Sequence, residues 1–500
     1  MDDFESAPGR LIPLGNATLD LLPAEVGRPG YARADLRPGV VHIGVGGFHR
    51  AHQAMYFDEL ARRGAGRDWG ETGVGLHSPQ MGEVMSAQDC LYTVVERGAG
   101  SSTARVVGVM GRYLYAPGQR EEVLGALSDP ATRLVTLTIT GNGYQLAPDG
   151  DFAGDDPLVA AELEDPGRPD TVFGYLVEAL ARRRQDGLAP FTVLSCDNIP
   201  GNGEAARTMV LSFARMRDGD LARWIEDEGA FPSSMVDRIT PETTADDRER
   251  IVRSLGVDDQ WPVITEPFSQ WVIEDWFCNG RPPLDEVGVQ FTADVVPYEQ
   301  TKKRLLNASH CAMGYLGYLA GYRTTAETMA SPSYAAFISA LMDEVIPLLP
   351  AAPGIDLPAY KASVLERLGN PAIADQLSRL CRRGSVKMPS YLLPSLREAL
   401  AAGRPHSLMT LAVAGWFRYL QGTDYAGEPI NVEGPRTEQF IRLARENDMD
   451  PRPLLGVRDV FDSLPEDPSF VRDLHVASEA LRAGPQETIE TWLATSGARR

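Results

Sequence analysis

The sequence has few cysteines, and they lie far apart. Only five occur among 500 residues, and none belongs to a Cys-x-x-Cys pair. This distribution argues against a disulfide framework and against a thiolate zinc site, and it is typical of a cytoplasmic protein with reduced thiols. The five are Cys90, Cys196, Cys278, Cys311 and Cys381.

The chain also lacks a long apolar run and an excess of basic residues. No stretch approaches the ~20 apolar residues of a membrane-spanning helix. The first ten residues are acidic and lack the apolar centre of a secretory signal. The formal net charge is −21, which argues against nucleic acid or an anionic membrane as a partner.

The length and composition predict a globular protein with two large domains. Five hundred residues exceed one ordinary core, and the 43% hydrophobic and 23% charged contents are those of a folded, soluble chain. In the first half, β-rich runs at 39–45, 72–78, 133–140 and 191–198 alternate with helical patterns at 48–63, 121–127 and 170–185. This rhythm predicts a Rossmann-like, doubly wound α/β domain over residues 1–293.

Beyond residue 293 the pattern becomes mostly helical. We therefore expect a mostly α-helical second domain over residues 294–500. The expected helices cover 298–322, 333–349, 357–368, 372–382, 392–402, 409–421, 437–446 and 469–483.

The stretch "GVGGFHRAH" follows the first predicted strand and resembles a dinucleotide-binding turn. Gly44 permits a tight turn, Gly46 allows close approach of a pyrophosphate, and Gly47 keeps the turn small. The helix that follows would offer free N–H groups and the positive end of its dipole. The third glycine position holds His49 instead. The candidate cofactor-binding residues are Gly44, Gly46, Gly47, Phe48, His49 and Arg50.

Two other interpretations of this turn remain open from the residues alone. His49 and His52, three residues apart, could begin a metal site, although no third ligand has an obvious spacing. The turn could also bind nothing. The second strand ends in "GLHSPQ", without the carboxylate that binds NAD ribose or an arginine for NADP, so the residues leave the cofactor choice open.

A second group of polar residues lies on the predicted helix 298–322. With ~100° per residue, Asn307 and His310 are about 60° apart, whereas Lys302 lies about 140° from Asn307. Lys303 falls between them, so an ideal helix favours Lys303. A buried lysine can act as a general base, and asparagine and histidine can hold an alcohol oxygen. A solvated helix face is the alternative interpretation.

A third piece is "SCDNIPGNG", at the end of the last predicted strand of the α/β domain. Ligands bind outside the carboxyl ends of such strands, where Asp197 and Asn198 lie. Asp and Asn also form turns and helix caps, and that alternative stays open.

Together these stretches resemble the polyol-specific long-chain dehydrogenase/reductase family, which includes the mannitol 2-dehydrogenases. The resemblance runs in family order from about residue 38 to 425. Besides the three motifs above, of which the second contains "KKRLLNASH", it rests on "QDCLYTVVER", "LTITGNGY", "PSSMVDRITP", "EPFSQWVIED" and "GWFRYLQGTD". Gly141 departs from the family, where an acid is common, and "HSPQ" resembles the "RSP" of uronate-reducing relatives.

The resemblance implies a role for each matching residue. It selects Lys302, five residues before the asparagine, as the general base in place of Lys303. The other assigned residues are Asn307 and Asn198 as an oxyanion hole, His310 to orient hydroxyls, Glu299 to pass protons to solvent, and Asp237, Arg379 and Lys387 to bind or line the substrate.

The implied activity is a metal-independent oxidation of D-mannitol to D-fructose with NAD. Within the family, the alternatives are a D-arabinitol or D-sorbitol dehydrogenase and a fructuronate or tagaturonate reductase. A non-catalytic dinucleotide-binding protein and a zinc alcohol dehydrogenase are alternatives of other classes. The expected partner is a polyol or ketose, and the expected state is a monomer or a weak homo-oligomer.

Overall fold

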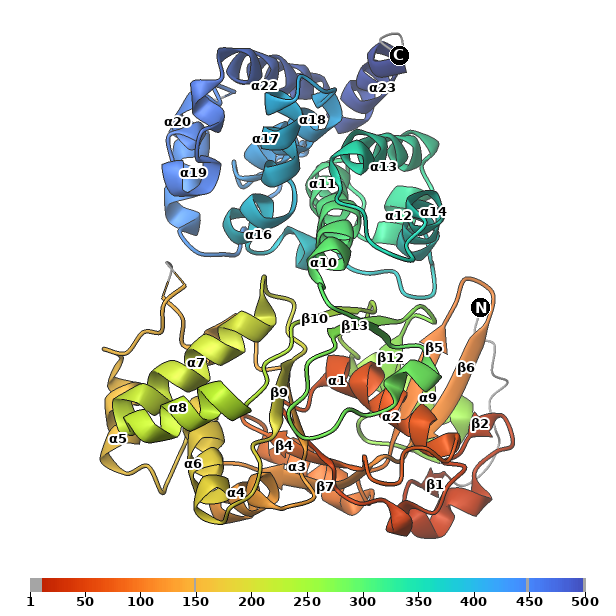
Figure 1. The fold of residues 1–500 in the computed structure, drawn as a ribbon. Coiled ribbons are helices and arrows are strands. Elements are labelled where there is room, and N and C mark those ends of the chain that lie inside the picture. Colours follow the sequence, from red (N-terminus) through yellow and green to blue (C-terminus); the bar gives the residue numbers. More distant parts are fainter. Residues whose placement is uncertain (1–10, 148–149, 447–448, 498–500) are drawn as a thin grey trace. The chain divides into compact units, whose positions relative to one another are not determined.

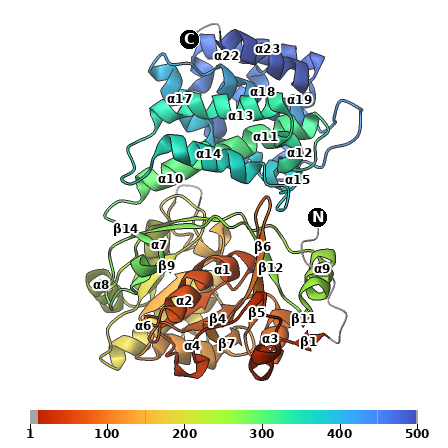
Figure 2. The ribbon, with the colours of Figure 1, turned by 90° about the vertical axis from the view of Figure 1, so that its right-hand side faces the viewer.

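The computed structural model describes residues 11–147, 150–446 and 449–497 (Figures 1 and 2). The chain divides into two compact units, Met1–Val296 and Pro297–Arg500. The acidic N-terminal decapeptide, where no secretory signal is expected, lies outside the described residues. Within the described ranges, no helix has the length and apolar character needed to cross a membrane.

The centre of the first unit is a five-stranded parallel sheet. Its strand order is β7-β4-β3-β8-β9, so the chain starts in the middle, moves outward on one side, and then returns to fill the other. The direction changes between β3 and β8, whose carboxyl ends are the usual ligand-binding edge of a doubly wound sheet. The strands are β3 (Val40–Ile43), β4 (Glu71–Gly75), β7 (Met110–Tyr115), β8 (Leu134–Leu137) and β9 (Thr192–Ser195).

Both faces of this sheet are buried, as expected for parallel strands. Side chains alternate along β3: Val41 and Ile43 belong to one core cluster and Val40 to another. The first cluster includes α4 (Arg120–Ser128), α6 (Val172–Gln185), α7 (Asn202–Arg217) and α8 (Gly219–Glu228). The second includes α2 (Gln53–Arg62) and α3 (Pro79–Ala87). The predicted doubly wound α/β fold is confirmed.

Smaller sheets complete the first unit. The four-stranded sheet contains β12 (Val263–Thr265), β5 (Tyr92–Arg97), β6 (Ser102–Val107) and β2 (Val26–Gly27). The three-stranded sheet contains β10 (Ser234–Asp237), β13 (Gln270–Glu274) and β14 (Gln290–Thr292). A pair is formed by β1 (Ile12–Pro13) and β11 (Val257–Asp258), and the remaining α-helices are α1 (Gly47–Ala51), α5 (Pro157–Glu164) and α9 (Ala245–Leu255).

The second unit is helical, as predicted, and is built around two buried helices, α11 (Ala308–Leu319) and α18 (Ser407–Tyr419) (Figure 1). Every residue from Leu408 to Tyr419 is buried, because helices pack around α18 on all sides. The surrounding helices are α10 (Val296–Lys302), α12 (Thr325–Met329), α13 (Pro332–Val345), α14 (Leu357–Leu368), α15 (Leu377–Cys381), α16 (Gly384–Tyr391), α17 (Leu393–Ala401), α19 (Thr437–Glu446), α20 (Arg452–Leu455), α21 (Arg458–Phe461), α22 (Pro468–Ala480) and α23 (Pro485–Gly497).

Several expected elements need correction. The predicted helix 48–63 is two helices, α1 and α2, because His52 leaves the helical conformation (φ −125°, ψ −84°). The predicted strand 72–78 ends at Gly75, since Ser78 already caps α3 by accepting a hydrogen bond from the Met81 N–H. The predicted helix 372–382 is shorter, and a second helix, α16, follows Arg383 in the left-handed region (φ 59°).

Candidate functional site

The glycine turn has the shape that a dinucleotide requires. Gly44 has a φ of 101°, and a Cβ there would lie 2.2 Å from the Thr138 carbonyl oxygen, so only glycine fits beside β8. A Cβ on Gly46 would meet nothing closer than 3.7 Å, and one on Gly47 nothing closer than 4.0 Å. The backbone above Gly46 and Gly47 is therefore open to a pyrophosphate, and the turn fits the cofactor expected for it.

Two of the expected cofactor-binding side chains point into the core instead. His49 is fully buried, and Arg50 is 3% exposed. The Arg50 guanidinium donates hydrogen bonds to the carbonyls of Gly46 and Trp261, and it lies 5.3 Å from the Tyr92 ring centroid. These two side chains pack beneath the turn. The ring of the half-buried Phe48 instead stacks on the His52 ring, with 5.0 Å between the ring centroids.

The two histidines of this motif have separate partners. The His52 Nε2 contacts the Gln270 carbonyl at 2.9 Å, and its Nδ1 contacts the Gln53 amide at 3.1 Å. The His49 Nε2 lies 3.3 Å from the Glu71 Oε2. Among the described residues, no group of three or more His, Cys, Asp or Glu side chains could hold a metal ion.

Asp197 joins the ends of two neighbouring strands. Its carboxylate accepts hydrogen bonds from the N–H groups of Ile139 and Thr140, both at 2.9 Å, and from the Tyr144 hydroxyl at 2.7 Å. Burial raises the pKa of this carboxyl, and the hydrogen bonds oppose the shift. The turn-forming interpretation thus describes Asp197, whereas the next residue, Asn198, is exposed.

The expected continuous helix 298–322 contains a π-turn. α10 ends at Lys302, residues Lys303–Asn307 are π-helical, and α11 begins at Ala308. The Ala308 N–H donates to the Lys303 carbonyl, five residues back. Because a π-turn closes with an i→i+5 hydrogen bond and so holds more residues than an α-turn, Lys302 lies closer to the face of Asn307 than on an ideal α-helix. The spacing of an ideal α-helix therefore does not decide between Lys302 and Lys303.

Lys303 is engaged elsewhere. Its Nζ forms an ion pair with the Glu299 Oε1 at 2.6 Å, and both side chains are largely buried. Lys302 is also buried, at 8% exposure. Glu299, expected to pass protons for Lys302, therefore has Lys303 as a direct partner.

Asn307 and His310 present polar atoms that the protein leaves unpaired. The Asn307 Nδ2 and the His310 Nε2 are shielded from solvent, and neither has a hydrogen-bond partner among the described residues. An unpaired buried polar group costs about 1–3 kcal/mol. Burial lowers the pKa of His310 to about 4, so its ring is neutral at pH 7 and can donate to or accept from a hydroxyl.

Arg379 and Lys387 lie near His310, because α11 packs against α15 and α16. The charges of both residues lower the pKa of His310, and that of Asp375 raises it. Lys387 donates to the Leu380 carbonyl at 2.9 Å. The structure thus brings three expected residues of the second unit together; the expected Asp237 is buried in the first unit, at the end of β10.

Asp375 is a residue of this group that our sequence reasoning missed. It is 3% exposed, and both of its carboxylate oxygens accept hydrogen bonds from the Arg379 guanidinium, one of them from Nε at 2.8 Å. The available signal was the i, i+4 spacing of an acid and an arginine.

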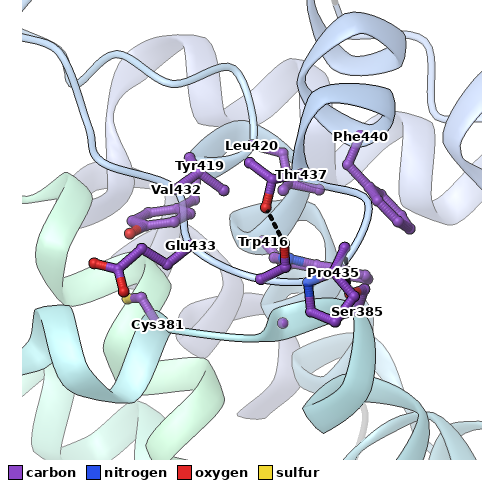
Figure 3. A pocket seen from close by; sticks show the side chains of 12 residues that line it. Cys381, Ser385, Trp416, Tyr419, Leu420, Val432, Glu433, Pro435, Thr437 and Phe440 are labelled. Atoms are coloured by element: carbon purple, nitrogen blue, oxygen red, sulfur yellow. Dashed lines mark hydrogen bonds between the residues drawn. The ribbon is translucent and has the colours of Figure 1, made fainter. Parts of the chain in front are cut away.

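A hollow elsewhere in the second unit contains none of the expected site residues. Its lining includes Cys381, Trp416, Tyr419 and Glu433 (Figure 3). Arg382 pairs with Glu433 at 3.3 Å beside it. We assign no function to this hollow.

Comparisons with known proteins agree with the predicted family. Residues 38–286 match the family model of the mannitol dehydrogenase Rossmann domain, and residues 294–482 match that of the mannitol dehydrogenase C-terminal domain. Mannitol 2-dehydrogenase of Aspergillus terreus is 43% identical over 93% of this chain and 95% of that protein. Mannitol 2-dehydrogenase of Pyricularia oryzae is 44% identical over 90% and 92%, respectively.

Solved structures give the same result. Pseudomonas fluorescens mannitol 2-dehydrogenase, in a ternary complex with NAD and D-mannitol, has a TM-score of 0.86 and 42% identity, covering 98% of this chain and 100% of that one. A D-sorbitol dehydrogenase in substrate-free form has a TM-score of 0.89 and 37% identity, covering 95% and 100%. From its glycine turn to its helical second unit, the chain therefore belongs to the mannitol dehydrogenase family.

Proposed function

We propose that this protein is a metal-independent, NAD-dependent polyol dehydrogenase that oxidises D-mannitol to D-fructose. The relatives named mannitol 2-dehydrogenase and the solved complex with NAD and D-mannitol support the substrate and the cofactor. The open backbone at Gly46 and Gly47 supports dinucleotide binding by the first unit. Work in a reducing compartment such as the cytoplasm is part of the proposal, and the five free cysteines are compatible with it.

The chemical proposal rests on two buried atoms that have no hydrogen-bond partner among the described residues, the Asn307 Nδ2 in the π-turn and the His310 Nε2 in α11. The Asn307 Nδ2 can donate to the oxygen that becomes the carbonyl, and the neutral His310 can bind a substrate hydroxyl. The Lys302 amine then removes the proton of the substrate hydroxyl, while the carbon that bears this hydroxyl loses its hydrogen as a hydride. Bound NAD would accept that hydride.

The remaining assignments rest on the family resemblance. Asn198 is proposed to share the oxyanion with Asn307, and Asp237 to line the substrate. Arg379 and Lys387 are proposed to bind substrate hydroxyls, supported by their position near His310. Glu299 is proposed to carry protons to solvent, with Lys303 as its ion-pair partner.

Replacing Lys302 by alanine tests the proposed base. Because a positioned general base contributes about 10²–10⁴-fold, we expect kcat for D-mannitol to fall by at least about 100-fold near pH 7. The dissociation constant for NADH, measured by fluorescence quenching, should stay within about threefold, since the change leaves the glycine turn intact.

The matched control is Lys303→Arg, which keeps the charge beside Glu299 but cannot act as a base at neutral pH. We expect its kcat to stay within about threefold of the wild-type value. A fully active Lys302→Ala variant, or an inactive Lys303→Arg variant, would show that the base is misassigned.

D-sorbitol oxidation is the second candidate function, favoured by the similarity to the D-sorbitol dehydrogenase structure. Rates with D-mannitol, D-sorbitol, D-arabinitol and fructuronate, each with NAD and NADP, would separate the alternatives. A kcat/KM at least tenfold higher for D-mannitol with NAD is the expected outcome. A preference for fructuronate would instead make the protein a hexuronate reductase.

A further inference from the structure

Three buried titratable side chains lie beneath the glycine turn, and the proposed reaction uses none of them. They are His42 on β3, His49 on α1 and Glu71 on β4. The two histidines are fully buried, and Glu71 is 2% exposed. Three different elements supply them, so the cluster exists only in the folded unit.

The two imidazole rings connect the strand before the turn with the helix after it. Their centroids are 3.5 Å apart and their planes differ by 6°, so the rings are stacked. In the usual fingerprint, the third glycine permits close packing of helix and strand. Here His49 occupies that position, and its ring lies flat on the ring of His42. The stacked rings therefore set the distance between the helix and the strand.

His42 is in turn connected to the first glycine. Its Nε2 lies 3.0 Å from the Thr138 hydroxyl, which donates to the Gly44 carbonyl at 2.8 Å. Because the Thr138 hydroxyl donates its hydrogen to the Gly44 carbonyl, its oxygen is left to accept a hydrogen bond from the His42 Nε2–H. The Nδ1 of His42 then accepts from the Thr136 hydroxyl at 2.8 Å. Burial lowers the pKa of His42 well below its ordinary value, so the ring is neutral, as this pattern of donors and acceptors assumes.

On its other side, His49 faces Glu71. The His49 Nε2 and the Glu71 Oε2 are 3.3 Å apart, and in the described chain neither nitrogen of His49 and neither carboxyl oxygen of Glu71 has a hydrogen-bond partner. A buried carboxylate without a donor is costly, whereas a neutral carboxylic acid can donate to an imidazole nitrogen.

The surrounding charges favour the neutral forms. Burial, together with the charge of Asp58 on α2, raises the pKa of Glu71 to about 8. Burial, together with the charge of Arg50 on the same helix, lowers the pKa of His49 to about 3. Three further titratable groups interact with the pair. Burial and His49 both lower the pKa of His42, and burial and Glu71 both raise the pKa of Tyr92 on β5. Burial raises the pKa of Cys196, which follows β9, and Asp197 and Glu71 act in the same direction.

We propose that Glu71 and His49 form a neutral acid–imidazole pair that positions the glycine turn for the dinucleotide. Glu71 donates its carboxyl proton to the Nε2 of His49, and the stacked His42 connects the pair to Gly44 through Thr138. Both are positioning residues, because neither side chain reaches the open surface of the turn. The dinucleotide part of this inference rests on the proposed function.

The protonation state is tested with Glu71→Gln, which keeps the shape and a donor to His49 without a titratable proton. Between the ordinary carboxyl pKa of 4.5 and the folded value of about 8, only the folded wild type holds this proton. Wild-type stability must therefore fall with rising pH relative to the variant. We expect the Tm of the variant minus that of the wild type to grow from pH 5 to about pH 8 and then stay constant. A difference independent of pH would overturn the neutral pair.

The positioning role is tested by NADH titration at pH 7. We expect Glu71→Gln to bind NADH within about twofold of the wild type, and His49→Leu, which removes the ring stack, to bind about tenfold more weakly. The kcat of His49→Leu at saturating NAD should stay within about threefold. Unchanged NADH binding by His49→Leu would overturn the positioning role, as would a tenfold loss in Glu71→Gln.

The readouts separate this inference from the proposed function. A wild type that neither binds NADH nor oxidises a polyol would contradict the proposed function and, with it, the dinucleotide part of the inference. The pH dependence of the Tm difference would still decide whether Glu71 and His49 form a neutral pair. If His49→Leu does not fold, His49→Gln replaces it in the NADH titration.

Discussion

Arg379, which is proposed to bind substrate, shows how one buried acid can hold the side chain of a cation. Its guanidinium is half exposed, yet Asp375 holds it through two oxygens and is itself 3% exposed. An ion pair with a buried partner is weak evidence for folding stability, because the desolvation of the carboxylate offsets the attraction. We infer that the pair holds the planar guanidinium in one orientation before substrate arrives, which would lower the entropic cost of binding.

Asp375→Asn should therefore weaken substrate binding more than turnover. We expect the KM for D-mannitol to rise about 5–30-fold, equivalent to ~1–2 kcal/mol, and kcat to change less. Steady-state kinetics at saturating NAD measures both. The control is Glu466→Gln, which removes an exposed ion pair, the 3.0 Å contact of Glu466 with Arg458. The KM of this control should stay within about twofold of the wild-type value. An Asp375→Asn variant with an unchanged KM would contradict the role of Asp375.

At the level of elements, the π-turn Lys303–Asn307 brings Lys302 closer to the face of Asn307 than an ideal α-helix would. A single π-turn acts as one extra residue in an α-helix and keeps the flanking turns in phase. Lys302 is five residues from Asn307, a spacing that an α-helix would place about 140° apart. The π-turn takes up the extra residue and reduces the angle between the lysine and the asparagine around the helix axis.

Insertions and deletions in this turn should therefore have unequal effects. Deleting Lys303 removes the extra residue and leaves Lys302 and Asn307 four apart on a regular α-helix, still on one face. Inserting one alanine after Lys303 should rotate them apart and lower kcat at least about 100-fold. We expect the deletion variant to keep at least roughly a tenth of wild-type kcat. Equal loss of kcat in two variants whose circular dichroism shows a native helix content would contradict this.

At the scale of the whole molecule, each unit has a core of its own, and the chemistry is proposed to need no metal. The first unit is built on a doubly wound sheet and the second on helices around α11 and α18. The proposed base is an amine, and the proposed oxygen ligands are an amide and an imidazole. The amine can remove the hydroxyl proton, and the amide and the imidazole can bind the oxygen, without a Lewis acid.

Exhaustive chelation is the test at this scale. After dialysis against EDTA and 1,10-phenanthroline, we expect kcat for D-mannitol to stay within about 20% of the untreated value, because a zinc-dependent oxidation would lose its activated oxygen. Recovery of activity on adding Zn²⁺ back to an inactive dialysed sample would instead identify a zinc alcohol dehydrogenase.

Local patterns in the sequence were sufficient for the fold class and the family. Alternating β-rich and helical stretches predict a parallel sheet, and the spacing of Gly44 and Gly46 predicts the turn that follows β3. Helix α14 begins and ends where its apolar periodicity predicts, at residues 357 and 368. These features depend on residues within one or two turns of each other, so the sequence records them directly.

Contacts between distant segments decided the rest. An ideal helix favoured Lys303, and only the folded helix contains the π-turn that brings Lys302 toward Asn307. His49 was expected at the cofactor, yet its ring stacks on His42 and faces Glu71, because β3 and β4 are neighbours in the sheet. The amino-acid sequence alone determined the fold class and where the glycine turn lies along the chain. Only the tertiary structure decided which side chains face the turn from below, because packing between elements, rather than spacing along the chain, sets those contacts.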